Sequence, residues 1–446
     1  MRGWHKRRTL PILSLTAITL CKIAMFIILF RLGYVEPYVG GSAANYYLPA
    51  ANSILTTGAF YVGPNESRSS KIAPGYPAFL ALVQWVASRS NLSLVVCIQM
   101  VFDWAIAILL LRTGRLETSI DAGWLAAVMW LVFPPAVVMS TWIASESLFA
   151  TMLVLSMAIA VRSLSRNGPL GLSLIAGVTL GAATLVRGTT QLFPVFFLGV
   201  CLARLIWVRD ACRYWLRTAA LLLVGMCIVV LPWTARNLRV LGEPVVVQTG
   251  LGSVFLAGSR REYFTIGDFS RRYTALQHDA AADGLPKPTD GKQTSEERWL
   301  FSLGLREYRI RLSAEPWWSL PVLVLHKSVR LWYGTETGAF NRQLLLGFFS
   351  LLVVPAGVFQ LWLWRKRHHV LTMLWGSLIL YFFLLSLVNL PMFRYALPLY
   401  PFLIFAAAHR YLEMWRHREN YFNISWSRMK PTLCCIVGVI TYRCWR

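Results

Sequence analysis

The chain has 446 residues, of which 56% are hydrophobic and only 14% are charged, and its mean hydropathy is +0.52. A soluble globular chain carries roughly a quarter charged residues, so a soluble enzyme is excluded, as are a disordered chain and a small disulfide scaffold. The 44 Lys and Arg residues outnumber the 20 Asp and Glu residues. We attribute this excess to cytoplasmic loops, which collect basic residues in membrane proteins, and not to nucleic acid binding. The composition predicts a polytopic membrane protein.

Apolar runs long enough to cross a membrane recur along the chain. The first, at 10–30, follows a basic N-terminal stretch and predicts an uncleaved signal anchor. Further spans are predicted at residues 92–111, 123–139, 147–163, 170–186, 190–206, 218–234, 343–363, 370–388 and 392–408. With both termini in the cytoplasm, the loops placed inside hold most of the Lys and Arg residues of the short loops. We therefore predict an all-α polytopic protein of the bacterial inner membrane with about ten transmembrane helices.

The predicted spans divide the chain into four parts. They are an N-terminal transmembrane catalytic module at 1–234 with a first exported loop at 31–91, a large exported loop at 235–342, C-terminal transmembrane helices at 343–408, and a basic cytoplasmic tail at 409–446. Two apolar runs, Pro74–Ala87 and Pro321–Trp332, are too short to cross the membrane. We predict that both form interfacial helices at the outer membrane face.

Ionisable residues at the outer ends of the predicted spans are the candidates for chemistry. Glu146 begins the fourth span, where a carboxylate either stabilises the helix N-terminus through the helix dipole or faces a substrate cavity. Arg187, Arg236 and Arg394 lie at the outer ends of other spans. Guanidinium groups match the geometry of phosphate oxygens. Three of them at one level of the membrane indicate an anion site, for a lipid head group or for a substrate phosphate.

The first exported loop combines small, aromatic and basic residues. Its sequence YYLPAANSILTTGAFY predicts a short helix that Gly58 ends, and Lys71 follows shortly before PGYP. Aromatic residues beside a lysine are also typical of the aromatic belt at a membrane surface. The loop alone leaves both interpretations open.

The order of several motifs resembles a known family. The loop helix and the basic residue before PGYP are followed by SE at 145–146, then VRGTT, PWTARN, LGEPVVVQTG and RYALPLYPF. In this order, from about residue 10 to 410, they resemble the membrane glycosyltransferases of GT-C architecture that use polyprenyl-phosphate sugars. Protein O-mannosyltransferases and lipid A aminoarabinose transferases are such enzymes. The resemblance implies a substrate cavity at the outer face, between the spans and the exported loops.

The resemblance also shows where this sequence departs from the family pattern. The catalytic Asp of the family stands about four residues before a Tyr of the loop helix, and counting back from Tyr46 leads to Ser42. The expected Asp is therefore missing. The resemblance leaves three candidates for the catalytic carboxylate, which are Glu36 and Glu66 of the first loop and Glu146.

The implied reaction transfers a sugar, with inversion, from a polyprenyl-phosphate donor to a hydroxyl of an unknown acceptor, which is a protein, a glycolipid or a polysaccharide. Cations must stabilise the phosphate that leaves, and a carboxylate must accept the hydroxyl proton. The predicted donor-binding residues are Lys71, Arg187, Arg236 and Arg394, and the predicted cavity residues are Ser42, Tyr46, Tyr76, Asn237 and Tyr395. The residues indicate no metal site and no cofactor, although the chemistry leaves room for a divalent cation. Membrane lipid is the remaining expected partner.

Three other functions remain open at this stage. A polysaccharide polymerase or ligase differs in using a diphosphate-linked donor. A transporter or lipid flippase is disfavoured because such folds often contain repeats and a site near the bilayer midplane, whereas here the polar candidates gather at one face and no repeat is found. A non-catalytic relative is consistent with the missing Asp at Ser42.

Overall fold

The structure is a computed structural model that describes residues 20, 39, 42–61, 70–87, 92–165, 168–208, 212–264, 275, 277–278, 281–282, 284–335 and 340–417. All but one residue of the predicted first span at 10–30 lie outside these ranges. Glu36, Glu66 and the predicted tail beyond residue 417 lie outside them as well. The fold is described below from the remaining chain.

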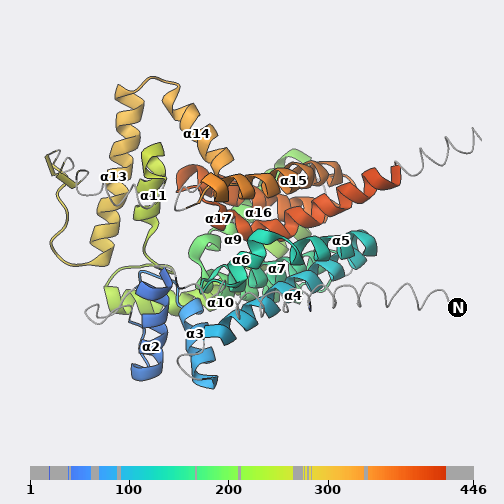
Figure 1. The fold of residues 1–446 in the computed structure, drawn as a ribbon, viewed down its shortest axis with the longest axis horizontal. Helices are drawn as coiled ribbons and strands as arrows, with labels where there is room; N and C mark the ends of the chain where they lie inside the picture. Colours follow the sequence, from blue (N-terminus) through green and yellow to red (C-terminus); the bar gives the residue numbers. More distant parts are fainter. Residues whose placement is uncertain are drawn as a thin grey trace, which may run out of the picture.

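Helices long and apolar enough to cross a membrane dominate the chain (Figure 1). Six such segments occur among the described residues, and they coincide with all or most of α4 (Leu92–Glu117), α7 (Glu146–Leu164), α9 (Phe193–Val208), α10 (Cys212–Leu241), α15 (Phe340–Trp364) and α16 (His369–Val388). The shorter α8 (Gly171–Val186) lies between α7 and α9 in the sequence, and residues 400–417 form a last long helix. The protein is thus an all-α integral membrane protein, as predicted, but a count of ten spans is not confirmed.

The predicted span at 123–139 is two helices and not one. The helices α5 (Ile120–Leu131) and α6 (Pro134–Ser140) meet at an angle of 56°. Pro134 and Pro135 explain the break, because proline lacks the N–H that the helix ladder needs and its ring crowds the preceding turn. Counted together, the bent pair is a seventh candidate span.

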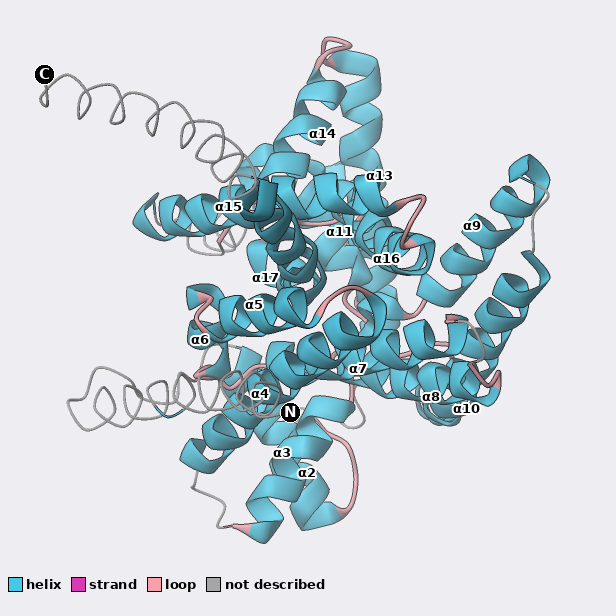
Figure 2. Ribbon diagram, turned by 90° about the vertical axis from the view of Figure 1, so that its right-hand side faces the viewer, coloured by secondary structure: helices cyan, strands magenta, loops and turns pink. Residues whose placement is uncertain are grey.

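Close helix crossings at glycines hold the first half of the bundle together. At the crossing of α8 and α10, a Cβ added to Gly177 would lie 2.4 Å from the carbonyl oxygen of Leu222, and one added to Gly225 would lie 2.4 Å from that of Leu174. Small residues let helix backbones approach closely inside a membrane. Figure 2 shows α8 and α10 side by side, next to α7.

We expect the Gly177→Val variant to be less stable than the wild type by about 1–3 kcal/mol, because the new side chain forces α8 and α10 apart. Thermal unfolding of the purified protein in detergent measures the loss. Gly199→Val in α9 is the matched control, since nothing lies within 4 Å of a Cβ built there. Equal unfolding midpoints for the two variants would contradict a tight crossing.

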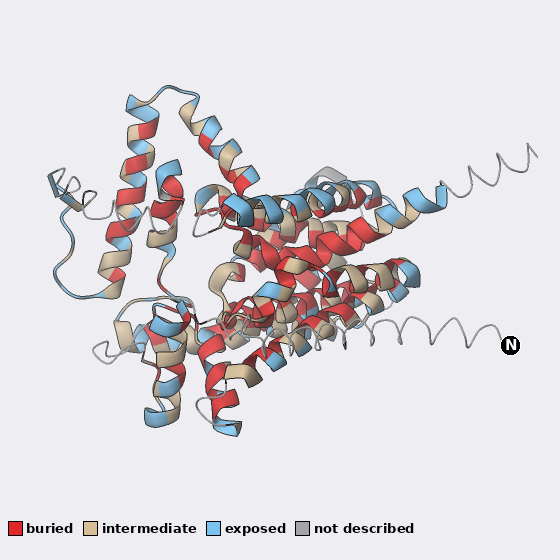
Figure 3. Ribbon diagram, in the orientation of Figure 1, coloured by how far each residue is buried: buried red, intermediate tan, exposed pale blue. Residues whose placement is uncertain are grey.

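The buried core follows α7, α16 and the segment at 399–408, whereas α15 presents an apolar face outward (Figure 3). On α15 the outward side chains of Phe340 and Leu351 are 74% and 71% exposed. Such a face is costly in water and is the normal surface of a helix that contacts lipid.

Short helices gather at one end of the bundle, at the left of Figure 1, which we call the loop end. From the first loop come the π-helix η1 (Ala43–Tyr47), α2 (Leu48–Thr57) and α3 (Gly75–Val86). Gly58 ends α2 in the left-handed conformation, with φ 67°, as predicted. The described residues of 242–335, which we call the large-loop module, add α11 (Leu251–Ser259), η3 (Arg261–Tyr263), α13 (Gln293–Ala314) and α14 (Ser319–Arg330). The helices α3 and α14 match the two short apolar helices predicted from the sequence.

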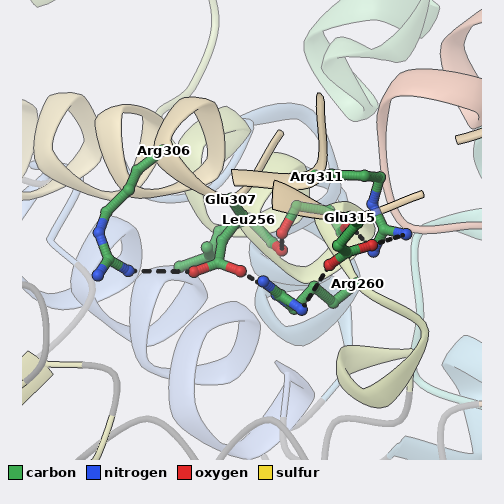
Figure 4. A network of polar contacts seen from close by, with 7 residues as sticks. Leu256, Arg260, Arg306, Glu307, Arg311 and Glu315 are labelled. Carbon is green, nitrogen blue, oxygen red and sulfur yellow. Dashed lines mark hydrogen bonds and ion pairs between the residues drawn. The ribbon is translucent and has the colours of Figure 1, made fainter. Parts of the chain in front are cut away.

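An ion-pair ladder joins α11 to α13 within the large-loop module (Figure 4). Arg260, which follows α11, contacts Glu307 and lies 3.2 Å from Glu315. Two arginines of α13 extend the ladder, with Arg306 3.3 Å from Glu307 and Arg311 3.0 Å from Glu315. Because Glu307 is buried, its partners are needed to compensate its charge. The ladder therefore fixes the C-terminal end of α11 against α13.

Lys327 of α14 is a fully buried lysine in the same module. Its Nζ donates to the carbonyl oxygen of Gly258 at 3.0 Å and to the hydroxyl of Tyr308 at 3.3 Å. Burial, with the nearby Arg311, lowers the pKa of Lys327 to about 7. An unfolded lysine has a pKa of about 10.4. Protonation of Lys327 therefore opposes folding most strongly below pH 7, and this penalty fades as the pH rises toward the unfolded value.

Replacing Lys327 by methionine is expected to stabilise the protein more at pH 6 than at pH 9, by about 2 kcal/mol. Unfolding midpoints of wild type and variant at both pH values test this, because the other titrating groups cancel in the comparison. Lys287→Met serves as the control, since Lys287 is 47% exposed and pairs with Glu296 at 3.1 Å. A gain that is the same at both pH values would exclude Lys327 as the titrating group.

Candidate functional site

The first part of the site consists of one carboxylate and two arginines at the loop end. The side chain of Glu146 is 5% exposed and lies 2.7 Å from a guanidinium nitrogen of Arg187. Arg187 and Arg394 both face the ring of Tyr395, at 5.0 Å and 5.2 Å from its centroid. Two guanidinium groups thus share one aromatic ring, and one of them is paired with the carboxylate of Glu146.

Helix connectivity explains why these residues meet. Glu146 is the first residue of α7, and Arg187 directly follows α8. The helices α7 and α8 pack against each other, and the hydroxyls of Ser163 near the end of α7 and Ser173 near the start of α8 lie 2.7 Å apart. The start of α7 and the end of α8 therefore lie together at the other end of the pair. Arg394 belongs to α17 (Phe393–Ala396), a single helical turn that directly precedes η4 (Leu397–Leu399). Glu146 also lies where the helix dipole favours a negative charge, so both roles considered for it from the sequence fit its position.

The second part of the site surrounds Lys71 and Arg236. The Nζ of Lys71 lies 4.9 Å from the ring centroid of Tyr46. Arg236 faces the rings of Trp233 and Phe60 at 4.7 Å and 5.7 Å, and it donates to the carbonyl oxygen of Phe60 at 3.2 Å. Both cations therefore rest on aromatic faces, an arrangement that holds a charge near an apolar surface.

Asn237, a predicted cavity residue, is fully buried and is hydrogen-bonded to the backbone of the segment that follows α10. Its amide donates to the carbonyl oxygens of Val245 and Val247 at 2.9 Å and 3.3 Å. Trp233 also donates to Val247, at 2.8 Å. The segment at 243–250, which we call the strap, is thereby fixed to the end of α10. The side-chain oxygen of Asn237 accepts from Arg236 at 3.0 Å, so Asn237 also contacts one of the cations of the site.

The π-helix η1 connects the two parts. Its consecutive tyrosines point to different neighbours, Tyr46 toward Lys71 and Tyr47 toward Ser145, whose hydroxyl lies 3.4 Å from that of Tyr47. Burial, and then the nearby Glu146 carboxylate, raise the pKa of Tyr47, so its hydroxyl keeps its proton and can donate. Of these two tyrosines, the sequence analysis selected only Tyr46 as a cavity residue.

Gln99 of α4 is a second residue that sequence reasoning missed. It accepts a hydrogen bond from the hydroxyl of Tyr76 at 3.0 Å and donates to the carbonyl oxygens of Ser140 and Trp142 at 2.9 Å and 2.7 Å. The amide thus ties the first loop to the turn that precedes Glu146. Gln99 stands inside the predicted span at 92–111, and a polar amide in an apolar span is itself a sign of a specific contact.

The remaining predicted residues have the following positions. Ser42 precedes η1 and is exposed, with no side-chain hydrogen bond that caps the helix. Tyr76 is fully buried and packs edge-on against Tyr47 at 5.0 Å. Glu36 and Glu66 lie outside the described residues. Among the residues that the structure does describe, no group of three or more His, Cys, Asp or Glu side chains is arranged to hold a metal ion.

Comparisons with known proteins place the fold. No protein-family model and no curated protein matches the chain. The archaeal oligosaccharyltransferase AglB from Archaeoglobus fulgidus, in complex with an inhibitory peptide and a dolichol-phosphate, is similar with a TM-score of 0.50 and 14% identity over 85% of this chain and 49% of that one. The apo form of the Archaeoglobus fulgidus oligosaccharyltransferase has a TM-score of 0.56 and 15% identity over 92% and 52%.

A third similar structure is ArnT from Cupriavidus metallidurans bound to undecaprenyl phosphate, with a TM-score of 0.42 and 14% identity over 92% of this chain and 77% of that one. This chain spans about half the length of the oligosaccharyltransferases that it matches. At these identities the likeness concerns the fold. Together with the helical bundle and its loop end, it shows that the chain shares the fold of these oligosaccharyltransferases, the GT-C fold expected from the sequence.

Proposed function

We propose that this protein is an inverting membrane glycosyltransferase that moves a sugar from a polyprenyl-phosphate donor to a hydroxyl acceptor at the outer membrane face. The observation that carries the proposal is the pair of guanidinium groups of Arg187 and Arg394 at the ring of Tyr395, with the carboxylate of Glu146 beside Arg187. Two guanidinium groups at one place match the geometry of phosphate oxygens. The fold shared with an oligosaccharyltransferase in complex with a dolichol-phosphate supports the same class of donor.

The ion pair of Glu146 and Arg187 suggests how one cluster serves both substrates. Without donor, Glu146 compensates the buried charge of Arg187. A donor phosphate that binds Arg187 and Arg394 takes over this compensation and releases the carboxylate. Glu146 can then accept the proton of the attacking hydroxyl, because a carboxylate that is no longer paired is the stronger base.

The transfer itself needs no further chemistry from the protein. The acceptor oxygen forms a bond to the anomeric carbon, while the bond from that carbon to the phosphate oxygen breaks and the phosphate keeps the electron pair. Attack from the face opposite the phosphate inverts the anomeric centre. The arginines stabilise the charge that develops on the phosphate, and binding both substrates in one site lowers the entropic part of the barrier.

The test uses purified protein in lipid with radiolabelled polyprenyl-monophosphate sugars, supplied one at a time, and membrane extract as the source of acceptor. Label that leaves the lipid and enters an acceptor supports the proposal. Glu117→Gln at the opposite end of the bundle, where Glu117 accepts from Ser165 at 2.6 Å, is the control carboxylate variant. If the folded protein binds polyprenyl phosphate but releases no sugar from any donor, the proposed transfer is wrong.

A further inference from the structure

Ser70, the residue before Lys71, is held through its main chain by the large-loop module. Its carbonyl oxygen accepts from the N–H of Thr249 at 2.7 Å. Its own N–H donates to the side-chain Oε1 of Gln293 at 3.3 Å. Ser70 is fully buried, so an N–H that lost its acceptor there would be left without water and without a partner, which is costly.

The two residues that hold the main chain of Ser70 are attached to different helices. Thr249 belongs to the strap, which α10 holds through the side chains of Asn237 and Trp233 and through Thr234, whose hydroxyl donates to the carbonyl oxygen of Val246 at 2.8 Å. This contact moves only with the end of α10. Gln293, in contrast, is the first residue of α13. It therefore follows any motion of α13 relative to the bundle.

The position of Lys71 depends on such a motion of α13, because the backbone of the preceding residue, Ser70, is hydrogen-bonded to Gln293. The ammonium group lies over the ring of Tyr46, on the π-helix that continues to Tyr47 and Ser145. A lysine presents a point charge on a long flexible stem, so the position of its backbone decides which places its Nζ can reach. The contact between Ser70 and Gln293 thus connects α13 to Lys71 in the second part of the site.

We propose that Gln293 is a positioning residue for Lys71, through which helix α13 of the large-loop module sets the affinity for the donor phosphate. This inference rests on the proposed function and on the role of Lys71 as a donor-binding residue, which the resemblance of the sequence implies. Coupling of this kind is reciprocal. A change in α13, such as one caused by an acceptor bound to the large-loop module, alters donor binding, and donor binding in turn favours one position of α13.

The test measures binding of undecaprenyl phosphate, without sugar, to the full-length protein in lipid nanodiscs. The variants are Lys71→Met, Gln293→Leu and the double variant. We expect Lys71→Met to weaken binding about tenfold, and Gln293→Leu about three- to tenfold, as loss of one hydrogen bond in a buried position implies. In the Lys71→Met background the added effect of Gln293→Leu should shrink to less than about twofold, because coupled residues are not additive.

Two further variants separate positioning from a general loss of structure. Gln293→Glu keeps an acceptor oxygen for the N–H of Ser70 and should restore binding to within about twofold of the wild type. Gln248→Leu makes the same type of change at an exposed position of the strap, and it should leave binding unchanged. Thermal unfolding of each variant confirms that the compared proteins are folded.

The outcomes distinguish the two proposals. A loss of equal size for Gln293→Leu with and without Lys71 overturns the positioning role, as does normal binding by Gln293→Leu when Lys71→Met is impaired. Normal binding by Lys71→Met overturns the assignment of Lys71 as a phosphate contact, and the inference about Gln293 with it. Sugar transfer that depends on Glu146 would stand in either case.

Discussion

Replacing Glu146 by glutamine should lower the rate of sugar transfer by at least about 100-fold, the usual contribution of a general base. The same change should not weaken binding of undecaprenyl phosphate. Without the carboxylate, the buried charge of Arg187 has lost its partner at 2.7 Å, and a phosphate compensates that charge more effectively than before. We expect transfer and binding to separate in this variant, with transfer lost and binding retained or strengthened.

The two measurements test the proton-accepting role directly. If Glu146→Gln loses donor binding along with transfer, Glu146 only organises the arginines. If transfer persists, the base is a different carboxylate, and Glu36→Gln and Glu66→Gln become the variants to compare. Because glutamine has nearly the same shape as glutamate, a change in packing at the start of α7 is avoided.

Replacing Arg394 by methionine should lower sugar transfer by about 100- to 1000-fold, as expected for a group that stabilises charge in the transition state. It removes one of the two cations beside Tyr395 and leaves the ion pair of Glu146 and Arg187 in place. Donor binding should weaken as well, because the remaining arginine is already neutralised by the carboxylate. Initial transfer rates and binding of undecaprenyl phosphate measure the two effects.

Two variants are the controls for Arg394→Met, a lysine substitution at the same position and the removal of a distant arginine. Arg394→Lys keeps the charge but loses the planar fork that faces Tyr395, so we expect partial activity. Arg410→Met removes another guanidinium group that lies over an aromatic ring, that of Phe359 at 5.2 Å, away from the site. Equal losses for Arg394→Met and Arg410→Met would show that stability, and not phosphate binding, accounts for the result.

The long apolar helices could be predicted from the sequence because hydropathy over about 20 residues depends on the chain alone. The break between α5 and α6 was missed, although Pro134 and Pro135 stand inside the apolar run. Proline is tolerated in membrane helices when neighbouring groups satisfy the freed backbone. The apolar run at 123–139 alone therefore does not show whether the prolines kink one helix or end it.

The sequence indicated individual residues of the candidate site but not the contacts between them. Arg187, Arg236 and Arg394 were selected because they lie at the outer ends of predicted spans. In the structure Arg187 and Arg394 face the ring of Tyr395, whereas Arg236 faces the rings of Trp233 and Phe60. The partners of these residues depend on contacts between segments far apart in the chain, as for Gln99 and the turn before Glu146. Local patterns contain no information about such contacts.

The pairing of Glu146 with Arg187 has a consequence for how the protein is made. These two residues lie in neighbouring helices, so they enter the membrane close together in time, and each can neutralise the other at once. Arg394 follows more than 200 residues later in the chain. The second guanidinium group at the ring of Tyr395 therefore joins a pair that is already balanced. If the proposed function holds, a chain interrupted before Arg394 would keep the ion pair of Glu146 and Arg187 but would lack the second cation for its donor.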